Sequence, residues 1–560
     1  MNGPAEGGRA GGAARHDLHF LPLGGSGEIG MNLNLYEYGG KWLMVDLGVT
    51  FADDGVPGVE VLMGDPQFIV ERRDQLVGLV LTHAHEDHLG AVQYLWPELR
   101  CPIWATPFTA AFLRRKLQET DFADQVEINV VPLGGRFKVG PFDLEMVTLT
   151  HSIPEPNALA IRTPAGTVFH TGDWKIDPDP LVGDVTDDAR IRAIGEGGVL
   201  AMVGDSTNAL KSGTSGSEAD VRRTLTELFA KYDGRIAVTC FASNVARLGT
   251  IATAAKAVGR DTALVGRSLW RIKEAAQEVG YLRGLPDFVD ERDAGFLPRD
   301  RTVLICTGSQ GEQRAALSRI AADQHPHIGL EKGDVVIFSS RMIPGNERNV
   351  LRLQNALAHL GVELVTDETH PLVHVSGHPC RDELSQMYQW VRPRIAIPVH
   401  GEALHMQAHA ELARSCQVPF ALVPENGTLI RLSETGPEIV DRVPTGRLAV
   451  DGDRLLPIGG PVLRNRVKLM WNGAVIATVV VDRKGRLVAP PKISAPGLLD
   501  PETDMDFAAE IVEAIEDGVG RAGRGANDVK VEEAVRRAIR ACIRERRDGK
   551  PVVDVHLVRV

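Results

Sequence analysis

One short segment limits what this chain can fold into, because it carries three histidines and an aspartate within six residues. The segment is Leu81-Thr82-His83-Ala84-His85-Glu86-Asp87-His88. It begins at the last residue of the apolar run 76–81, and that run predicts a buried β-strand. Four such side chains on one turn would repel one another and would be costly to bury without a metal ion. Imidazole and carboxylate together favour zinc or manganese over calcium. The segment therefore predicts a metal site at a strand end.

Further ligands are expected at the ends of other strands. A site for one ion needs about three protein ligands, so the four in this segment indicate two ions roughly 3.5–4 Å apart, as in phosphoesterases. His151 follows the predicted strand 146–150, Asp173 follows 168–170, and His400 follows 394–399. A carboxylate is the natural bridge between two cations, so we expect Asp173 to bind both.

Strands alternate with helices along much of the chain, which predicts layered α/β architecture. This order holds over 76–208. It holds again over 209–364, where predicted helices 218–232, 245–258 and 268–279 alternate with strands 236–239, 262–265, 303–305 and 335–338. Such alternation is typical of a parallel sheet.

The N-terminal region combines a low-complexity tail with a glycine-rich turn. Residues 1–17 are rich in Gly and Ala and are expected to be flexible. Gly25, Gly27 and Gly30 fit the spacing of a dinucleotide-binding loop, but a strand rather than a helix follows them. A tight turn that needs positive φ is the better interpretation, within a β-hairpin that leads to a strand ending at Asp46.

The C-terminal region predicts a linker and a small α+β domain. Pro and Gly gather in 441–462. Strands 467–471 and 474–481 around Asn472-Gly473 predict a hairpin, apolar spacing predicts two helices, and 552–560 predicts a last strand. Two helices on a three-stranded sheet are expected. The second helix has a basic face that is either a solvated surface or an RNA contact, formed by Arg536, Arg537, Arg540, Arg544 and Arg547.

Composition excludes several classes of protein. Of 560 residues, 43% are hydrophobic, and 62 Lys and Arg stand against 74 Asp and Glu, giving a net charge of −12. This is a globular profile. It argues against a uniformly basic nucleic-acid coat but leaves room for an enzyme with a local basic groove.

The six cysteines form no CxxC pair, which indicates a reduced, cytoplasmic protein. No apolar stretch of about 18 residues predicts a membrane span, and the N-terminus lacks the apolar core of a secretory signal.

The HxHxDH segment with its downstream His and Asp resembles the metallo-β-lactamase superfamily. The resemblance implies two divalent ions, Zn²⁺ or Mn²⁺, as cofactors. Asp46 is implied to support the site rather than bind metal. The implied ligands are His83, His85, His151 and Asp173 for one ion, and Asp87, His88, the bridging Asp173 and His400 for the other.

Three further motifs resemble the β-CASP nucleases within that superfamily: 204–207 (GDST), 374–378 (HVSGH) and 398–402 (PVHGE). The segments 23–30, 307–312 and 343–347 resemble those of the bacterial ribonuclease J family. The implied fold is α/β: a metallo-β-lactamase αββα sandwich with an inserted β-CASP α/β domain and a small α+β C-terminal domain. The expected domains are a tail (1–17), the metallo-β-lactamase domain (18–208 and 365–440), the β-CASP insertion (209–364), a linker (441–462) and the C-terminal domain (463–560).

The implied activity is metal-assisted hydrolysis of RNA, as a 5′→3′ exonuclease preferring a 5′-monophosphate and as an endonuclease, in RNA processing and mRNA decay. We expect His378 to act as general acid, His374 and Ser376 to hold the scissile phosphate, and Asp205 to orient a histidine. Turns at the carboxyl ends of strands in the insertion suit a 5′-phosphate. The residues expected in catalysis are His374, His378, Asp87 and Asp205, and those expected to contact RNA are His374, Ser376, Gly377, His378, Ser243, Asn244 and Ser309.

Other interpretations stay open. A β-CASP nuclease acting on DNA or on RNA 3′ ends shares the ligands, a non-catalytic RNA-binding scaffold would share the fold, and a small-molecule hydrolase such as a thioesterase is disfavoured by the insertion. Expected partners are single-stranded RNA, a second copy in a homodimer or homotetramer, and other RNA-decay proteins, with no membrane. These residues do not decide between zinc and manganese, or between exonuclease and endonuclease activity.

Overall fold

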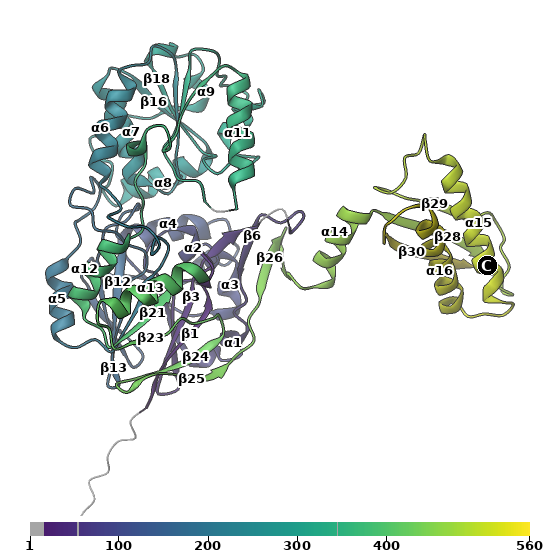
Figure 1. Cartoon of the computed structure of the whole chain (residues 1–560), viewed down its shortest axis with the longest axis horizontal. Helices are drawn as coiled ribbons and strands as arrows, with labels where there is room; N and C mark the ends of the chain where they lie inside the picture. The colour runs from purple at the N-terminus through teal and green to yellow at the C-terminus, as the bar shows by residue number, and fades with distance from the viewer. Residues whose placement is uncertain (1–15, 53–54, 344) are drawn as a thin grey trace, which may run out of the picture. The chain divides into compact units, whose positions relative to one another are not determined.

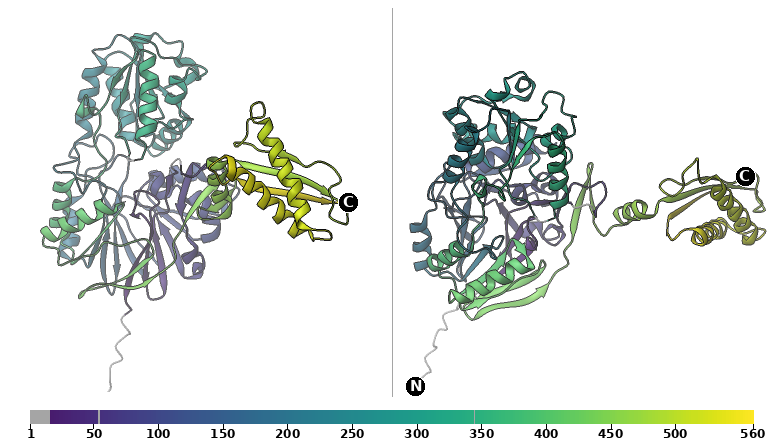
Figure 2. Two further views of the ribbon diagram at one scale, coloured as in Figure 1. Left: turned by 45° about the vertical axis from the view of Figure 1, so that its right-hand side comes forward. Right: turned by 45° about the horizontal axis from the view of Figure 1, so that its top comes forward.

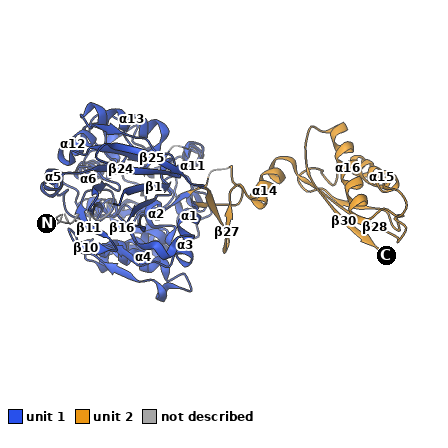
Figure 3. Ribbon diagram, turned by 90° about the horizontal axis from the view of Figure 1, so that it is seen from below, with its two compact units in different colours: residues 1–50, 63–445 blue, residues 51–62, 446–560 orange. Residues whose placement is uncertain are grey.

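A computed structural model describes residues 16–52, 55–343 and 345–560. It divides into two compact units, one of residues 1–50 and 63–445 and the other of residues 51–62 and 446–560 (Figure 3). Most of the predicted tail, residues 1–15, lies outside the described residues.

Two mixed sheets form a sandwich in the first unit (Figure 1). Tyr36 and Val80 of one sheet share a buried core with Leu144 and Ile397 of the other. The first sheet has the order β25 (Gly436–Arg442), β24 (Thr428–Ser433), β1 (Leu18–Gly24), β3 (Leu33–Tyr38), β4 (Lys41–Val45), β7 (Leu76–Val80), β8 (Ile103–Ala105) and β9 (Ile128–Val130). The second has the order β10 (Arg136–Val139), β11 (Phe142–Thr148), β12 (Asn157–Thr163), β13 (Gly166–His170), β14 (Ala201–Asp205), β21 (Ile395–Val399) and β23 (Phe420–Ala421).

Helices cover this pair of sheets, as the predicted αββα sandwich requires. Ile191, Met387 and Leu412 bring three helices into one core with Phe169 and Met202 of the second sheet. The helices of this part are α1 (Gln67–Val70), α2 (Glu86–Leu89), α3 (Val92–Leu99), α4 (Pro107–Leu117), α5 (Asp188–Glu196), α12 (Arg381–Val391) and α13 (Ala403–Ser415).

The inserted part of the first unit has its own six-stranded sheet, and its strand pairs are parallel, as predicted. Its order is β17 (Val289–Asp290), β16 (Asp261–Val265), β18 (Thr302–Cys306), β15 (Ile236–Thr239), β19 (Val335–Phe338) and β20 (Glu363–Val365). Its helices are α6 (Glu218–Phe229), α7 (Val245–Ala257), α8 (Arg267–Glu278), α9 (Glu291–Ala294), α10 (Ala316–Ala321) and α11 (Glu347–His359). The predicted helices and strands of this part are confirmed, with small differences at their ends.

The glycine-rich turn after β1 positions a distant loop. Gly25, Gly27 and Gly30 have φ of +83°, +80° and +92°, which confirms a turn that other residues rarely adopt. The short strand β2 (Ser26–Gly27) pairs with β22 (Gly401–Glu402), and the amide of His400 donates to the carbonyl of Gly25. The turn therefore fixes the backbone at His400.

The second unit contains a small α+β domain. A sheet of order β29 (Lys492–Ser494), β28 (Ala474–Val481) and β30 (Val552–Arg559) carries α15 (Met505–Ala522) and α16 (Asp528–Arg546) on one side (Figure 2). Ile511 and Ile539 of the helices share a core with Val475 and Val479 of β28. Two helices on a three-stranded sheet are thus confirmed.

The hairpin predicted around Asn472-Gly473 is wrong. Residues 467–471 belong to helix α14 (Pro461–Asn472), and β29 is the strand that pairs with β28 in their place. Pro461 occupies the first helical turn, where its missing amide hydrogen costs nothing. Gly473, with φ of +64°, ends the helix. Asn-Gly therefore acts here as a helix terminus instead of a two-residue hairpin turn.

The segment 441–462, predicted as a linker, contains the antiparallel pair β26 (Arg447–Asp451) and β27 (Arg454–Pro457). Two short strands, β5 (Val49–Phe51) and β6 (Val61–Gly64), lie at the two ends of the segment 51–62, which belongs to the second unit. Among the described residues, no helix is both long and apolar enough to cross a membrane.

Candidate metal centre

The predicted ligands lie at the carboxyl ends of strands in both sheets of the sandwich. His83 and His85 follow β7, and Asp87 and His88 lie in the short helix α2. His151 follows β11, Asp173 follows β13, and His400 follows β21 with φ of +52°. Residues that are far apart in the sequence therefore meet at one edge of the fold.

The first group consists of four residues whose ligand atoms lie within 4.8 Å of one another: His83, His85, His151 and Asp173. Nδ1 of His85 lies 3.0 Å from Nε2 of His83 and 3.0 Å from Nε2 of His151. Oδ2 of Asp173 lies 3.9 Å from each of those Nε2 atoms. Three nitrogens and one oxygen enclose one position, which suits a tetrahedral ion.

The second group is formed by Asp87, His88, Asp173 and His400. Oδ2 of Asp173 lies 3.2 Å from Nε2 of His88 and 3.6 Å from Nε2 of His400. Oδ2 of Asp87 lies 3.6 Å from both nitrogens. The same oxygen of Asp173 thus faces both groups, which is the position of a bridging ligand.

Unpaired atoms in the two groups fit bound cations. Oδ1 of Asp173 and Nε2 of His400 are buried and have no hydrogen-bond partner among the described residues, an arrangement that is costly unless a ligand satisfies it. Burial and the neighbouring histidines lower the pKa of His83 and His151 well below the ordinary value. Their rings are therefore neutral and offer lone pairs, as metal ligation requires.

His88 differs, because three carboxylates face it. Burial lowers its pKa, but Asp173, Asp87 and Asp46 together raise it well above the ordinary value. When no cation is bound, a proton on Nε2 would lie between His88 and the two carboxylates of its group. A divalent ion would take the place of that proton.

Other residues hold the ligand rings in one orientation. Oδ2 of Asp46 lies 2.7 Å from Nδ1 of His88, and this carboxylate also accepts hydrogen bonds of 2.8 Å from the amide and the hydroxyl of Thr82. Oδ1 of Asn32 lies 3.0 Å from Nδ1 of His400. Partners of this kind fix the tautomer of a ligating histidine and raise its basicity. Asp46 thus lies behind the ligands and holds one of their rings.

The Nδ1 atoms of His151 and His83 are satisfied in the same way, whereas Nδ1 of His85 faces the other ligands. Nδ1 of His151 donates to the carbonyl of Gly377 at 2.5 Å, and Nδ1 of His83 lies 3.0 Å from the hydroxyl of Thr82. Gly377 therefore supports a ligand through its backbone. A Cβ there would lie 2.7 Å from the ring of His151, so the close approach needs glycine.

The segment 374–378 lies against this centre. Nδ1 of His378 is 2.8 Å from Oδ2 of Asp205 and 3.7 Å from Oδ2 of Asp173. Ser376 accepts a hydrogen bond of 2.7 Å from Nδ2 of Asn208, which also donates to the carbonyl of His378. Residues of β14 and of the turn after it thus hold the loop beside Asp173.

His374 lies at the other end of this loop, near the inserted part. Burial and the positive charges of Arg247 and Arg341 lower its pKa well below the ordinary value. Its Nδ1 atom is buried and has no hydrogen-bond partner among the described residues. The ring is therefore neutral, and a buried open nitrogen of this kind is available to a ligand.

The predicted phosphate residues of the insertion lie in turns after two neighbouring strands. Ser243 and Asn244 follow β15, and Ser309 follows the neighbouring strand β18. Asn244 caps α7 by accepting a hydrogen bond from the amide of Arg247 at 2.8 Å, which is ordinary turn chemistry. No hydrogen bond among the described residues joins these three side chains to the two ligand groups.

Sequence reasoning missed three polar residues: Asn32 and Asn208, which hold parts of the site in place, and Arg247, which lies near His374. Asn32 follows the glycine-rich turn, and Asn208 stands three residues after Asp205. Their positions next to motifs were a weak signal. Arg247 offered none, since it lies within a helix of mostly small and apolar residues.

Comparisons with known proteins identify the domains of this chain. Family models match residues 53–191 (beta-lactamase superfamily domain), 233–357 (Ribonuclease J, beta-CASP domain), 362–419 (Zn-dependent metallo-hydrolase RNA specificity domain) and 461–560 (Ribonuclease J C-terminal domain). A solved structure of a protein of unknown function from Enterococcus faecalis V583 covers 74% of this chain and 100% of its own, with a TM-score of 0.52 at 18% identity. That likeness supports the fold alone.

Curated relatives cover nearly the whole chain. Ribonuclease J of Sinorhizobium meliloti is 44% identical over 98% of both chains. Ribonuclease J of Mycolicibacterium smegmatis is 38% identical over 97% of both. That of Helicobacter pylori strain 26695 is 34% identical over 90% of this chain and 74% of its own. On this evidence, with a metallo-β-lactamase domain, a β-CASP insertion and a matching C-terminal domain in one chain, the protein belongs to the ribonuclease J family.

Proposed function

We propose that this protein is a metal-dependent ribonuclease that hydrolyses RNA phosphodiester bonds at a two-ion centre. The observation that carries the proposal is the position of Asp173, whose Oδ2 atom faces both ligand groups and lies 3.7 Å from Nδ1 of His378. When bound, two divalent ions supply an activated water and neutralise the charge that develops on the phosphate.

The protein side chains supply the proton transfer. Asp205 accepts from Nδ1 of His378, which leaves Nε2 of that ring to donate a proton to the departing 3′-oxygen.

Asn208 ties Ser376 and the carbonyl of His378 together, so the loop meets the scissile phosphate in one conformation. His374 and Ser376 bind phosphate oxygens in this proposal. The side chain of Asp87 is 30% exposed, against 2% for Asp173, and it orients the attacking group.

The substrate is RNA in this proposal, since the family model over 362–419 is described as an RNA specificity domain and the curated relatives are ribonucleases. The 5′→3′ direction, the preference for a 5′-monophosphate and the additional endonuclease activity follow from the family resemblance. Ser243, Asn244 and Ser309 bind the 5′-phosphate in this proposal, from turns at the carboxyl ends of neighbouring parallel strands.

The ions are Zn²⁺ or Mn²⁺, because His and Asp ligands suit both. We further propose a homodimer or homotetramer, and a reduced cytoplasmic setting, which the six free cysteines favour. Sedimentation of the full chain, activity after reconstitution with each metal, and fractionation of cells test these three points separately.

The decisive experiment compares one labelled sequence as RNA and as DNA. Each substrate carries a monophosphate, a triphosphate or a hydroxyl at its 5′ end. We expect release of labelled mononucleotide from monophosphorylated RNA, internal fragments from the other RNAs, and little cleavage of DNA. Asp173→Ala and His85→Ala should abolish both products. Equal cleavage of DNA would instead identify a DNA-directed β-CASP nuclease, and RNA binding without cleavage would identify a scaffold.

A further inference from the structure

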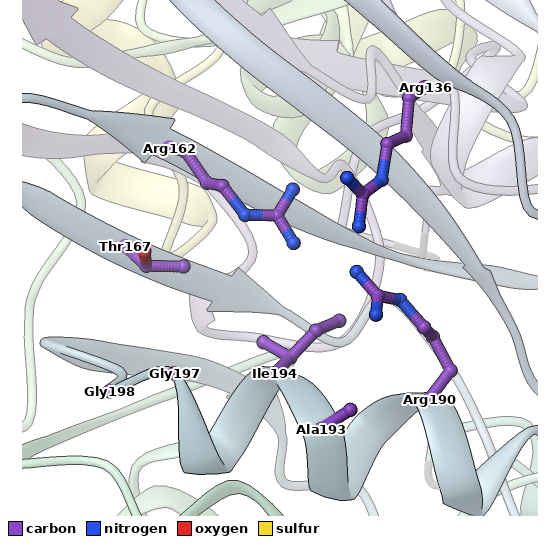
Figure 4. A pocket seen from close by; sticks show the side chains of 8 residues that line it. All are labelled: Arg136, Arg162, Thr167, Arg190, Ala193, Ile194, Gly197 and Gly198. Atoms are coloured by element: carbon purple, nitrogen blue, oxygen red, sulfur yellow. The ribbon is translucent and has the colours of Figure 1, made fainter.

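A second charged site lies on the outer face of the seven-stranded sheet. Arg136 of β10, Arg162 of β12 and Arg190 of α5 converge on one spot, and their guanidinium groups approach one another from three elements (Figure 4). Among them lies Glu145 of β11, whose side chain is 3% exposed. Like charges do not gather in this way unless anions hold them.

Glu145 holds part of the cluster. It accepts hydrogen bonds from Nε and Nη2 of Arg190 at 2.5 and 2.9 Å and from Nη2 of Arg162 at 2.6 Å, and its Oε2 lies 3.2 Å from Nε of Arg136. Burial alone would raise its pKa, but the bonds from Arg190 and Arg162 outweigh burial and lower the pKa to about 2. The carboxylate is therefore fully ionised near neutral pH.

One carboxylate does not balance three guanidinium groups. The bidentate bond from Arg190 is sufficient to neutralise Glu145, so Arg162 and Arg136 remain as excess positive charge. Asp187 also faces Arg190, but it accepts from the amide of that residue at the start of α5 and does not line the pocket. Among the described residues, no second carboxylate forms an ion pair with Arg136 or Arg162.

The neighbouring residues on the same sheet face do not cancel this excess. Asp143 of β11 lies directly opposite Lys138 of β10 on one side and Arg162 of β12 on the other. One carboxylate between two cations compensates one of them. With Glu145 included, two carboxylates stand against Arg136, Lys138, Arg162 and Arg190, which leaves two positive charges in excess.

The excess charge borders a pocket that is half open to solvent. Its volume is about 200 Å³, and its walls are completed by small and apolar residues: Thr167, Ala193, Ile194, Gly197 and Gly198. This is smaller than the roughly 300–1,000 Å³ of pockets for drug-sized ligands. It suits a compact, doubly charged anion, and a phosphate monoester carries about −1.5 to −2 charge at neutral pH.

The pocket is separate from the metal centre. Strand β12 begins at Asn157, whose amide donates to the carbonyl of Thr82 beside the metal ligands, and it reaches Arg162 five residues later. At the rise of a β-strand this places the arginine about 17 Å away along the strand. A ligand here would contact none of the catalytic residues.

We propose that this pocket is a binding site for a phosphate dianion, supplied either as inorganic phosphate or as the terminal phosphate of a small nucleotide. Arg162 and Arg136 donate to the phosphate oxygens while Arg190 remains bound to Glu145. Helix α5 lines the pocket and packs on the second sheet through Ile191 and Ile194, so this wall of the pocket is held in place by the core.

The test is isothermal titration of the metal-loaded full chain with inorganic phosphate. We expect Arg136→Gln, which removes a side chain that is 57% exposed, and Arg162→Gln each to weaken one class of phosphate site by about tenfold or more, as for a lost charged hydrogen bond. Phosphate held at the metal centre contributes equally to all variants, so the difference between isotherms reports the pocket.

Arg192→Gln is the matched control, because it removes the same charge from α5, the helix beside the pocket, at 51% exposure and does not line the pocket. Thermal melting shows whether Arg162→Gln still folds, and if it does not, Arg136→Gln alone decides. Identical isotherms for wild type and Arg136→Gln, or an equal loss in Arg192→Gln, would overturn the proposal. Adenosine monophosphate as a second titrant identifies the source: tighter binding than phosphate indicates a nucleotide, and equal or weaker binding indicates free phosphate.

Discussion

Nδ1 of His378 lies 2.8 Å from Oδ2 of Asp205, and the carboxylate of Asp205 is buried at the end of β14. This bond orients the ring and stabilises its protonated form. Since general acid catalysis contributes roughly 10²–10⁴-fold to a rate, we expect Asp205→Asn to lower kcat by about 10² or more with little change in KM. Steady-state cleavage of a labelled RNA over a range of concentrations measures both constants.

A double variant tests whether Asp205 acts through His378. Residues that work as one unit have non-additive effects, so Asp205→Asn combined with His378→Ala should be no slower than His378→Ala alone. If the two losses multiply, Asp205 has an independent role and the proposed division of labour fails.

Asp46 gives a prediction about metal affinity. Its carboxylate holds Nδ1 of His88, and partners of this kind contribute about 10- to 100-fold to affinity. Asp46 has φ of +63°, a conformation that Asn also tolerates, so Asp46→Asn keeps the backbone. We expect metal binding at the second group to weaken by about 10- to 100-fold, measured by competition with a chelator. Asp124→Asn, at an exposed aspartate of a short turn, serves as the control and should bind metal like wild type.

The metal centre could be predicted because its ligands are rare residues at strand ends. His83, Asp173 and His400 each follow an apolar run, and parallel strands bring such ends together whatever the loops between them do. Asn32 escaped notice because an asparagine after a glycine turn has many ordinary uses. Its position between His88 and His400 depends on the pairing of Ser26 with Gly401, which lies far away in the chain.

The predicted hairpin failed for a local reason. The residues 467–471 (VKLMW) are mostly apolar, and so short a run fits a strand as well as a helix. Pro461 and Gly473 set the limits of a helix of 12 residues, and Trp471 remains 76% exposed on it. The signals for a helix start and a helix end were stronger evidence than a short apolar run.

Arg247 and Glu218 form a buried pair that joins α6, α7 and the inserted sheet. Nε and Nη2 of Arg247 donate to Glu218 at 2.7 and 3.0 Å, and Nη1 donates to the carbonyl of Ser339 at 2.7 Å. Removing one partner of such a pair costs about 3–5 kcal/mol, because the other charge stays buried. We therefore expect Arg247→Met to lower the free energy of unfolding by about that amount in urea titration of the full chain.

The double variant Arg247→Met with Glu218→Leu separates the pair from its surroundings. Replacing both charges restores a large part of the stability if the cost comes from the unpaired carboxylate. A double variant less stable than Arg247→Met would show instead that other bonds of these residues dominate. Exposed Arg223→Met on α6, which is paired with Asp220 at the surface, should change stability by less than about 1 kcal/mol.

Lys211 gives a prediction about pH. Its Nζ atom donates to Oδ1 of Asn208 at 2.5 Å, next to the loop that holds His378. Burial, together with the charge of Arg341, lowers the pKa of Lys211 to about 8, so the ammonium is charged at pH 7 and mostly neutral at pH 9. In the unfolded chain the lysine keeps this proton to about pH 10.4. Between about pH 8 and about pH 10.4 the unfolded chain therefore binds more protons, so the contribution of Lys211 to the free energy of unfolding rises with pH. RNA binding should show the opposite trend, because one positive charge near the phosphates is lost.

The measurement is RNA affinity against salt concentration at pH 7 and pH 9, in a His378→Ala background that does not cleave. Each phosphate contact contributes about 0.7 to the slope of log affinity against log salt for single strands. We expect the wild-type slope to decrease by about that amount at pH 9, while Lys211→Arg keeps its slope because arginine stays charged. Lys231→Arg, on the surface of the inserted part, should follow the wild type. If Lys211→Arg also loses slope at pH 9, another group is responsible for the change, and Lys211 does not contact RNA.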